Sequence, residues 1–290
     1  MNAGPAPGHA IATTETAYAK INLALHVRRR RQDRYHDIET IFAFAEDGDL
    51  IEAVAGAPRL SLTGSFSGFL AHEDPEDNLV MRAARGLAAA LDRPEPPAIR
   101  LDKRLPVAAG IGGGSADAAA VLRLLCRHYE LDFDDPRVTA LARDLGADVP
   151  ACLASRPLRG SGRGDELLAV EAGGLAGLPL LLVNPRLPLP TAPVFAAWDQ
   201  VDRGPLAVGD PLAAALAGRN DLEPPARRLC PVIGEIVTML AAQAGALLAR
   251  MSGSGATCFA LFDRREALDS ADRAIAAQRP GWWRLATRLR

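Results

Sequence analysis

Apolar and polar residues alternate along the first part of the chain. The alternation runs through residues 17–27 and returns in residues 37–44 and 49–54, with polar turns between these segments. A period of two is that of a β-strand with one face against a core. The three segments are therefore predicted to be strands, preceded by a flexible tail at residues 1–16.

The apolar spacing changes to that of a helix after residue 78. An apolar residue recurs at every fourth position from Leu79 to Leu91, and the breaker-rich residues 92–98 follow. This stripe predicts a helix over residues 78–91. A short strand at residues 99–101 and two helices at residues 115–129 and 136–145 are predicted next.

Glycines interrupt the middle of the chain, at positions 160, 162, 164, 173, 174 and 177. We place a domain boundary there, which gives an N-terminal domain at residues 17–165 and a C-terminal domain at residues 166–290. The later patterns predict a strand at 180–184, helices near 192–198 and 232–244, and a strand-turn-strand at 247–262. Because strands and helices mix without strict β-α-β alternation, the predicted fold class is α+β.

Composition and charge narrow the function classes. The 290 residues are 49% hydrophobic and 23% charged, which is typical of a folded globular protein rather than a disordered one. A net charge of -2 gives no reason to expect nucleic acid as a partner. No apolar run reaches the ~20 residues of a membrane helix, so no membrane association is expected. The four cysteines lack C-x-x-C spacing, which favours reduced thiols and a cytoplasmic protein; a monomer or weak homodimer is the working expectation.

The segment LPVAAGIGGGSADAAA, residues 105–120, carries the strongest chemical signal. Glycines at positions 110, 112, 113 and 114 remove every Cβ that would keep an anion from the backbone, and they permit positive φ. Ser115 is placed to be the N-cap of the helix that follows, and the free N–H groups of a helix start favour negative charge. The loop is therefore predicted to hold phosphate groups.

Two other kinds of phosphate loop fit less well. A P-loop ends in Gly-Lys-Ser/Thr, but Ser115 follows Gly114 with no lysine. A dinucleotide fingerprint needs a third glycine where Ser115 stands and a second strand with an acidic residue about 20 residues on, so hydride transfer is the runner-up only. A second glycine turn, MSGSGAT at residues 251–257, is by itself typical of a hairpin. Beside the first loop it is a candidate second wall of the phosphate pocket.

Two charged residues stand in otherwise apolar surroundings, Lys20 in AYAKINLAL and Asp148 in LGADVPACL. A buried charge is costly without a partner. We hypothesise that the two meet across the cleft, where Lys20 keeps Asp148 ionised and Asp148 is the base for a substrate hydroxyl. The alternatives, Lys20 reaching solvent and Asp148 capping a local turn, stay open at this point.

A hairpin rich in arginine leads to the pair Tyr35 and His36. The run at residues 28–31, together with Arg34, is most typical of a solvated hairpin tip that adds mild attraction for an anionic substrate. The five histidines have no metal-site spacing. Tyr35 and His36 could stack on and hydrogen-bond a base, although such a pair is more often structural.

Ordered blocks over about residues 17–265 resemble the GHMP kinase superfamily. The blocks are AYAKINLALHV, YHDIETIF, DNLVMRAA, LPVAAGIGGGSADAAAVL, LGADVPACL, GRGDEL, LPTAPVF, RNDLE and MSGSGATCFALF. The Tyr-His pair and LPTAPVF are similar to the branch that acts on a cytidyl diphosphate methylerythritol in the non-mevalonate isoprenoid pathway. The resemblance implies a two-domain fold with the active site in the cleft between the domains, and transfer of the ATP γ-phosphate to the 2-hydroxyl of that substrate.

The resemblance also implies roles for single residues. Asp148 is the base with Lys20 beside it, and Asn22 and Lys20 contact the substrate. His36 reads the cytosine edge, while Tyr35 and Phe195 stack on its ring. Mg²⁺ is expected with ATP, touching Ser115. The residues implied to bind ATP are Asn78, near the adenine, and Pro106, Val107, Ala108, Ala109, Gly110, Ile111, Gly112, Gly113, Gly114 and Ser115.

Three features depart from the family pattern: the tail before Tyr18 is longer, the hairpin is rich in arginine, and Arg34 stands where the family usually has glycine. Because arginine does not adopt positive φ freely, the turn that presents Tyr35 and His36 is expected to be altered. Three hypotheses stay open at this point. They are a kinase for the cytidyl substrate, another GHMP kinase acting on a sugar, an amino acid or mevalonate, and a non-catalytic nucleotide-binding module.

Overall fold

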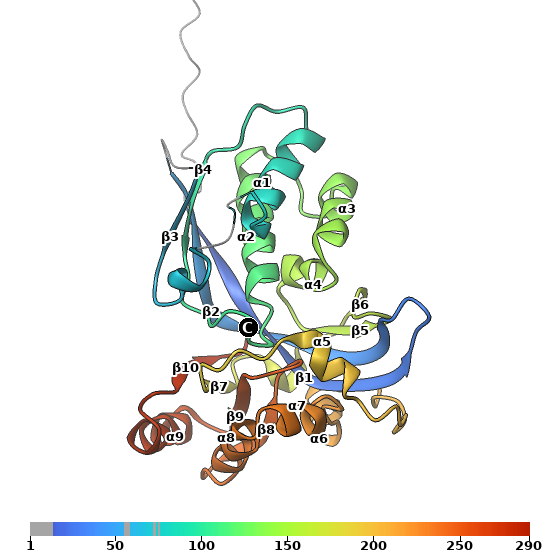
Figure 1. Cartoon of the computed structure of the whole chain (residues 1–290), viewed down its shortest axis with the longest axis vertical. Coiled ribbons are helices and arrows are strands. Elements are labelled where there is room, and N and C mark those ends of the chain that lie inside the picture. Colours follow the sequence, from blue (N-terminus) through green and yellow to red (C-terminus); the bar gives the residue numbers. More distant parts are fainter. Residues whose placement is uncertain (1–13, 55–58, 72–73, 75) are drawn as a thin grey trace, which may run out of the picture.

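The structure, a computed structural model, describes residues 14–54, 59–71, 74 and 76–290. Within these residues the chain forms two halves, each built on one antiparallel or mixed sheet (Figure 1). The helices α1–α4 cover one face of a 6-stranded sheet in the N-terminal half, and the helices α8 and α9 lie on the outer side of a 4-stranded sheet in the C-terminal half (Figure 1). The predicted α+β class is confirmed.

The first sheet is organised around two long antiparallel strands, β1 and β2. Its members in hydrogen-bonding order are β3 (Leu60–Thr63), β4 (Ala98–Asp102), β2 (His36–Val54), β5 (Leu158–Ser161) and β6 (Glu166–Ala169), with β1 (Thr14–Arg30) paired to β2.

β2 corrects the prediction of two separate strands at residues 37–44 and 49–54. The polar residues Glu46 and Asp47, which suggested a turn, are exposed positions within one continuous strand. Pairing with β1 resumes past them, with Tyr18 opposite Gly48. An ideal Cβ on Gly48 would lie 1.8 Å from the carbonyl oxygen of Ala17. This position therefore needs glycine for the two strands to approach.

The helices of the first half are α1 (Leu79–Ala90), α2 (Gly113–His128), α3 (Pro136–Leu145) and α4 (Val149–Ala154), with a short 3₁₀ helix at η1 (Ser67–Phe69). The three predicted helices are confirmed to within two residues. α2 is the central one, because it is buried from Ala116 to Cys126 and its alanines let neighbouring elements approach closely. The predicted cap is wrong: Gly112, at φ 65°, is the N-cap of α2, and Ser115 lies in the first turn. A left-handed glycine turns the chain into the helix before Ser115 is reached.

The second half contains the sheet β10 (Trp283–Arg288), β7 (Pro179–Asn184), β9 (Cys258–Phe262) and β8 (Ala246–Met251) in that order. The helices are η2 (Gly173–Leu175), α5 (Thr191–Ala196), α6 (Pro211–Ala217), α7 (Glu223–Leu229), α8 (Val232–Ala241) and α9 (Arg265–Gln278). The predicted strand at 180–184 and the strand-turn-strand at 247–262 are confirmed. The predicted helices near 192–198 and 232–244 are present and somewhat shorter.

The limits of the two halves differ from the predicted ones. β6 pairs with β5, so the first sheet continues to Ala169 and the boundary placed between residues 165 and 166 falls inside a hairpin. The predicted division into two parts is itself confirmed by the two separate sheets. β1 begins at Thr14, so residues 14–16 belong to the sheet rather than to the predicted tail, whose residues 1–13 lie outside the described part. Among the described helices, none has the length and apolar character needed to cross a membrane.

Candidate active site

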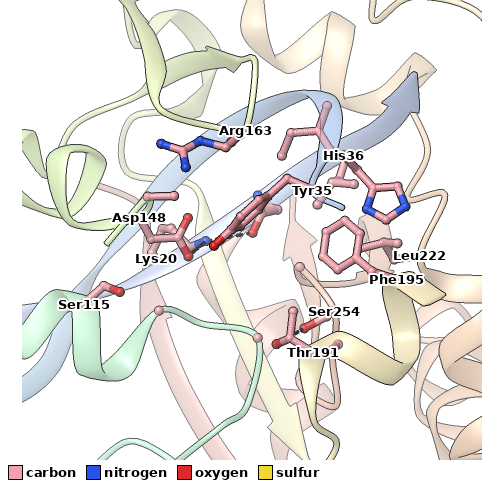
Figure 2. A pocket seen from close by; sticks show the side chains of 18 of the residues that line it. Lys20, Tyr35, His36, Ser115, Asp148, Arg163, Thr191, Phe195, Leu222 and Ser254 are labelled. Carbon is pink, nitrogen blue, oxygen red and sulfur yellow. Dashed lines mark hydrogen bonds and ion pairs between the residues drawn. The ribbon is translucent and has the colours of Figure 1, made fainter. Parts of the chain in front are cut away.

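A cavity of about 870 Å³ lies where β1, the glycine loop, the start of α4, the β1–β2 hairpin and α5 meet (Figure 2). Its wall contains most of the predicted site residues. These are Lys20, Asn22, Tyr35, His36, Ala108, Ala109, Gly110, Gly112, Gly113, Gly114, Ser115, Asp148 and Phe195.

β1 carries Lys20 into this cavity. The register of β1 against β2 shifts between Tyr18 and Lys20 and again between Asn22 and Ala24, and such bulges re-aim side chains. The Lys20 side chain is 5% exposed, and its Nζ lies 2.9 Å from Oδ2 of Asp148. Asp148 precedes α4 without capping it through its side chain, which is 39% exposed. The predicted contact is confirmed, and the two alternatives for these residues are excluded.

Asn22 holds the Lys20 ammonium from a second side. Its Oδ1 accepts from Lys20 Nζ at 3.2 Å, and its Nδ2 donates to the Thr40 hydroxyl at 2.8 Å. The Thr40 hydroxyl in turn donates to the carbonyl oxygen of Ala24. This chain of bonds fixes the orientation of the Asn22 amide. The ammonium has three donors, so one is left for a ligand in the cavity.

The glycine loop lies against the Lys20 side chain. Gly110 and Gly112 have φ of 74° and 65°, and an ideal Cβ on Gly112 would lie 3.1 Å from Cε of Lys20. Gly113, Gly114 and Ser115 form the first turn of α2 on the cavity wall. The first N–H groups of a helix have no intrahelical acceptor, so this turn is suited to bind an anion.

The second glycine turn adjoins the first, as predicted. The Ser252 hydroxyl donates to the carbonyl oxygen of Gly110 at 3.0 Å, and the Thr257 N–H donates to that of Ala109 at 3.1 Å. Gly253 and Ser254 line the same cavity. Asn220, which the site prediction missed, donates to the carbonyl oxygens of Met251 and Gly253, each at 2.8 Å. Its signal in the sequence is the RNDLE block.

Four predicted ATP-binding residues lie outside the cavity wall: Asn78, Pro106, Val107 and Ile111. Asn78 caps α1, because its Oδ1 accepts from the Val80 N–H at 2.9 Å. Ile111 is fully buried, and its carbonyl oxygen accepts from the Lys20 N–H at 3.1 Å. These two residues support the elements around the cavity, and their contacts with ATP stay predictions.

Aromatic side chains line the end of the cavity that the β1–β2 hairpin provides. His36 is buried, with its ring centroid 5.0 Å from that of Phe195 and 5.7 Å from that of Trp198. Burial, followed by the charge of Arg30, lowers the pKa of His36, so its ring is neutral at pH 7 and can both donate and accept. Tyr35 is 56% exposed, and in Figure 2 it is drawn between the Lys20–Asp148 pair and the His36–Phe195 pair.

Arg34 does not abolish the positive-φ turn before Tyr35. It adopts φ 70° itself, a conformation that glycine favours. The turn is closed by hydrogen bonds from the Arg34 N–H to the Arg31 carbonyl oxygen and from the Tyr35 N–H to Oδ1 of Asp33. Arg34 is thus in the left-handed region, in a turn that the Asp33 side chain closes, and the expected difference from the family's turn stays a prediction.

The sequence prediction missed a buried cluster beneath the glycine loop. Lys103 Nζ lies 2.6 Å from Oδ2 of Asp49 and 2.6 Å from Oδ2 of Asp117. Oδ1 of Asp49 accepts from two N–H groups just before the loop, whereas Oδ1 of Asp117 has no partner among the described residues. Burial, only partly offset by Lys103, raises the pKa of Asp117 to about 8. An ideal Cβ on Gly113 would lie 3.2 Å from Lys103 Nζ, so the loop rests on this cluster.

Mg²⁺ suits this site as a partner of the nucleotide. The described residues contain no group of three or more His, Cys, Asp or Glu side chains that could hold a metal ion. The Ser115 hydroxyl and the Asp148 carboxylate are oxygen donors on the cavity wall. Because Mg²⁺ is usually bound by substrate phosphates, water and one or two protein oxygens, these residues fit an ion that arrives with ATP.

Comparison with known proteins gives consistent matches over most of the chain. Residues 78–156 match the GHMP kinases N terminal domain, and residues 207–280 match the GHMP kinases C terminal domain. The chain is 72% identical over 277 residues to a 4-diphosphocytidyl-2-C-methyl-D-erythritol kinase of Rhizorhabdus wittichii, covering 96% of this chain and 94% of the relative.

Two further matches agree. A protein of the same name from Sphingopyxis alaskensis is 53% identical, covering 95% of this chain and 98% of the relative. A crystal structure of 4-(cytidine 5'-diphospho)-2C-methyl-D-erythritol kinase superposes with a TM-score of 0.76 at 34% identity, covering 95% of this chain and 98% of that one.

Proposed function

Because the chain belongs to the GHMP kinases, and within them to the 4-diphosphocytidyl-2-C-methyl-D-erythritol kinases, we propose that it transfers the γ-phosphate of ATP to the 2-hydroxyl of 4-diphosphocytidyl-2-C-methyl-D-erythritol. This is a step of the non-mevalonate route to isoprenoid precursors. The observation that carries the proposal is the Lys20–Asp148 ion pair on the wall of a cavity that also contains the start of α2.

Asp148 is the base in this proposal. Lys20 engages its Oδ2, while Oδ1 has no hydrogen bond with a described residue and can accept the proton of the substrate hydroxyl. The hydroxyl oxygen then bonds to the γ-phosphorus, the bond from that phosphorus to the bridging oxygen breaks, and ADP leaves. The Lys20 ammonium stays beside the oxygen that develops negative charge. General base catalysis of this kind contributes about 10²- to 10⁴-fold to the rate.

The start of α2 is the proposed site of the ATP phosphates, with Ser115 as the protein ligand of Mg²⁺. Bound Mg²⁺ would neutralise phosphate charge during transfer. An ideal Cβ on Gly114 would lie 3.5 Å from Cδ1 of Leu79, which places the start of α1 beside the loop. This contact supports the proposal that Asn78, the cap of α1, lies near the adenine.

The aromatic end is the proposed site of the cytosine. Neutral His36 can donate to and accept from the edge of the base, and Tyr35 and Phe195 offer faces for its ring. Asn22 and Lys20 would contact the methylerythritol part. The free thiols of Cys126, Cys152, Cys230 and Cys258 are all buried, which supports a cytoplasmic enzyme; a monomer or weak homodimer is proposed, and gel filtration tests it.

The test is ATP consumption with a panel of acceptors: the cytidyl substrate, mevalonate, homoserine and galactose. We expect turnover with the first at a kcat/KM at least about 10³-fold above the others, because buried recognition groups left unpaired by a wrong substrate cost several kcal/mol. Equal turnover of mevalonate or homoserine would reject the assignment in favour of another GHMP kinase. Turnover of no acceptor would favour a nucleotide-binding module.

A further inference from the structure

The arginines of the β1–β2 hairpin fall into two groups. Three are paired: Arg28 with Glu39 and Asp202, Arg29 with Asp37, and Arg31 with Asp33 and Asp37. Arg30 and Arg34 form no side-chain ion pair or hydrogen bond with any residue in the described part of the chain, and both line the cavity. The arginines of the hairpin are therefore not all equivalent surface charges. Arg30 and Arg34, the two without an acidic partner in the described part of the chain, are also the two that line the cavity.

A third arginine reaches the same end of the cavity from another element. Arg163 lies in the turn between β5 and β6, and its Cζ is 5.2 Å from the centre of the Tyr35 ring. It lines the cavity although it also pairs with Asp165. Figure 2 shows its guanidinium above the Asp148 carboxylate, at the edge of the pocket. Two hairpins that are far apart in the sequence thus place arginine around one tyrosine.

The acidic side chains of the cavity wall do not neutralise these arginines. The wall contains Asp33 and Asp148. Asp148 is engaged by Lys20, and Asp33 by Arg31 and the Tyr35 N–H. Asp165 compensates Arg163, so the net positive charge at the aromatic end of the cavity comes from Arg30 and Arg34.

We infer that Arg30, Arg34 and Arg163 form a cationic rim that binds the phosphate groups of a cytidine nucleotide whose base lies against Tyr35, His36 and Phe195. The inference rests on the proposed function for the identity of the base. Guanidinium groups suit phosphate, since their planar donors can bind two oxygens at once and their faces stack on aromatic rings. The rim makes the protein discriminate a nucleotide from the bare nucleoside, so free CDP competes with the cytidyl substrate.

Calorimetric titration of the whole chain with cytidine and with CDP tests the rim. ADP and Mg²⁺ are present at saturation, so that CDP does not enter the phosphate loop. We expect CDP to bind at least about tenfold more tightly than cytidine, because three exposed arginine–phosphate contacts contribute a factor of about two to five each. The advantage of CDP should shrink as salt is raised, since exposed charges are screened over about 8 Å at physiological ionic strength.

Variants separate the rim from the fold. Arg34→Gly removes the charge and suits the positive φ, so it does not strain the turn, and Arg30→Gln and Arg163→Gln keep polar side chains. Each should weaken CDP and leave cytidine unchanged, with the triple variant binding both alike. Arg29→Gln is the matched control, because Arg29 is on the same hairpin, is paired with Asp37 and does not line the cavity.

The outcomes distinguish this inference from the proposed function. If the wild-type protein phosphorylates the cytidyl substrate but binds CDP no better than cytidine, the rim is wrong and the function stands. If CDP binds through the arginines but the cytidyl substrate is not phosphorylated, the function is wrong and the rim stands. Failure of both ligands to bind overturns the rim, and so does an equal loss of CDP affinity in Arg29→Gln.

Discussion

Arg123 donates through Nη1 to the carbonyl oxygen of Cys152 at 2.6 Å and through Nη2 to that of Thr16 at 2.8 Å. It is buried in α2 and also reaches Ser155 and Glu15. The Arg123 guanidinium, which α2 carries, therefore joins α4 to β1. α4 begins after Asp148, and β1 carries Lys20. We expect the distance between the Lys20 ammonium and the Asp148 carboxylate to depend on these Arg123 bonds.

Replacing Arg123 with Met should lower both stability and turnover. The free energy of unfolding should fall by about 2 to 4 kcal/mol, because buried carbonyl oxygens and the Glu15 carboxylate lose their partner. The kcat should fall at least about tenfold in protein that remains folded, because small displacements of reacting groups are costly, while the KM for ATP changes little.

Arg127→Met is the control. Arg127 is on the same helix, and within the described part of the chain its side chain forms an ion pair with Glu15 and a hydrogen bond to Thr14 and no other, so unchanged kcat is expected there. A folded Arg123→Met protein with normal kcat would contradict this role of Arg123.

Asp148→Asn should abolish most turnover without loss of nucleotide binding. An amide cannot take the hydroxyl proton, so kcat should fall about 10²- to 10⁴-fold while the Kd of ATP stays within about twofold. Single-turnover kinetics and nucleotide titration measure the two quantities. Asp144→Asn, an exposed position on α3, serves as the matched change of charge. A kcat within threefold of the wild type would reject Asp148 as the base.

Gly110→Ala should damage the nucleotide site by forcing the two glycine segments apart. A Cβ on Gly110 would lie 2.5 Å from the carbonyl oxygen of Ser252, so the two glycine segments would have to separate, and the KM for ATP should rise at least about tenfold. Gly177→Ala is a close control, because Gly177 has φ 75° against 74° for Gly110 but no atom within 4 Å of its Cβ position. Both variants should lose about 1 to 2 kcal/mol of stability from the positive φ. Gly110→Ala should lose more because of its backbone clash, and only Gly110→Ala should lose ATP affinity. Equal KM values for the two would show that the contact with Ser252 is unimportant.

The residues that could be predicted from the sequence are those whose immediate neighbours already make them unusual. Lys20 and Asp148 are single charges in apolar runs, so each predicted a partner, and the partner proved to be the other. The density of glycines before α2 predicted a backbone anion site for the same local reason. Regular helices followed from apolar spacing, which is also local information.

The rest could not be predicted, because it depends on contacts between distant segments. Lys103 is 54 residues from Asp49 and 14 from Asp117. Lys103 and Asp49 stand among polar residues that suggest a surface, and Asp117 stands among alanines with no local sign that Lys103 is its partner. The exposed middle of β2 has the composition of a turn, and only its pairing with β1 makes it a strand. The arginine hairpin likewise divides into paired and unpaired members through partners such as Asp202, 174 residues from Arg28.

The buried Asp117 should make stability depend on pH in a defined direction. Burial raises its pKa from 3.8 to about 8 in the folded protein, so between these values the folded state holds a proton that the unfolded state has released. Stability therefore falls as pH rises through this window, by at most about 1.4 kcal/mol per pH unit for one proton. The side chain of the Asp117→Asn variant cannot titrate. The free energy of unfolding of the variant should therefore rise relative to that of the wild type between pH 5 and pH 8. Urea denaturation at several pH values measures this difference.

Asp135→Asn is the control, because the hydrogen bond from Arg137 lowers the pKa of Asp135 to about 2. The contribution of Asp135 to stability is therefore complete above pH 3.8 and is lost only as pH falls toward 2. It adds no pH dependence of stability above pH 5. Parallel stability curves for Asp117→Asn and the wild type would show that Asp117 is ionised in the folded protein throughout.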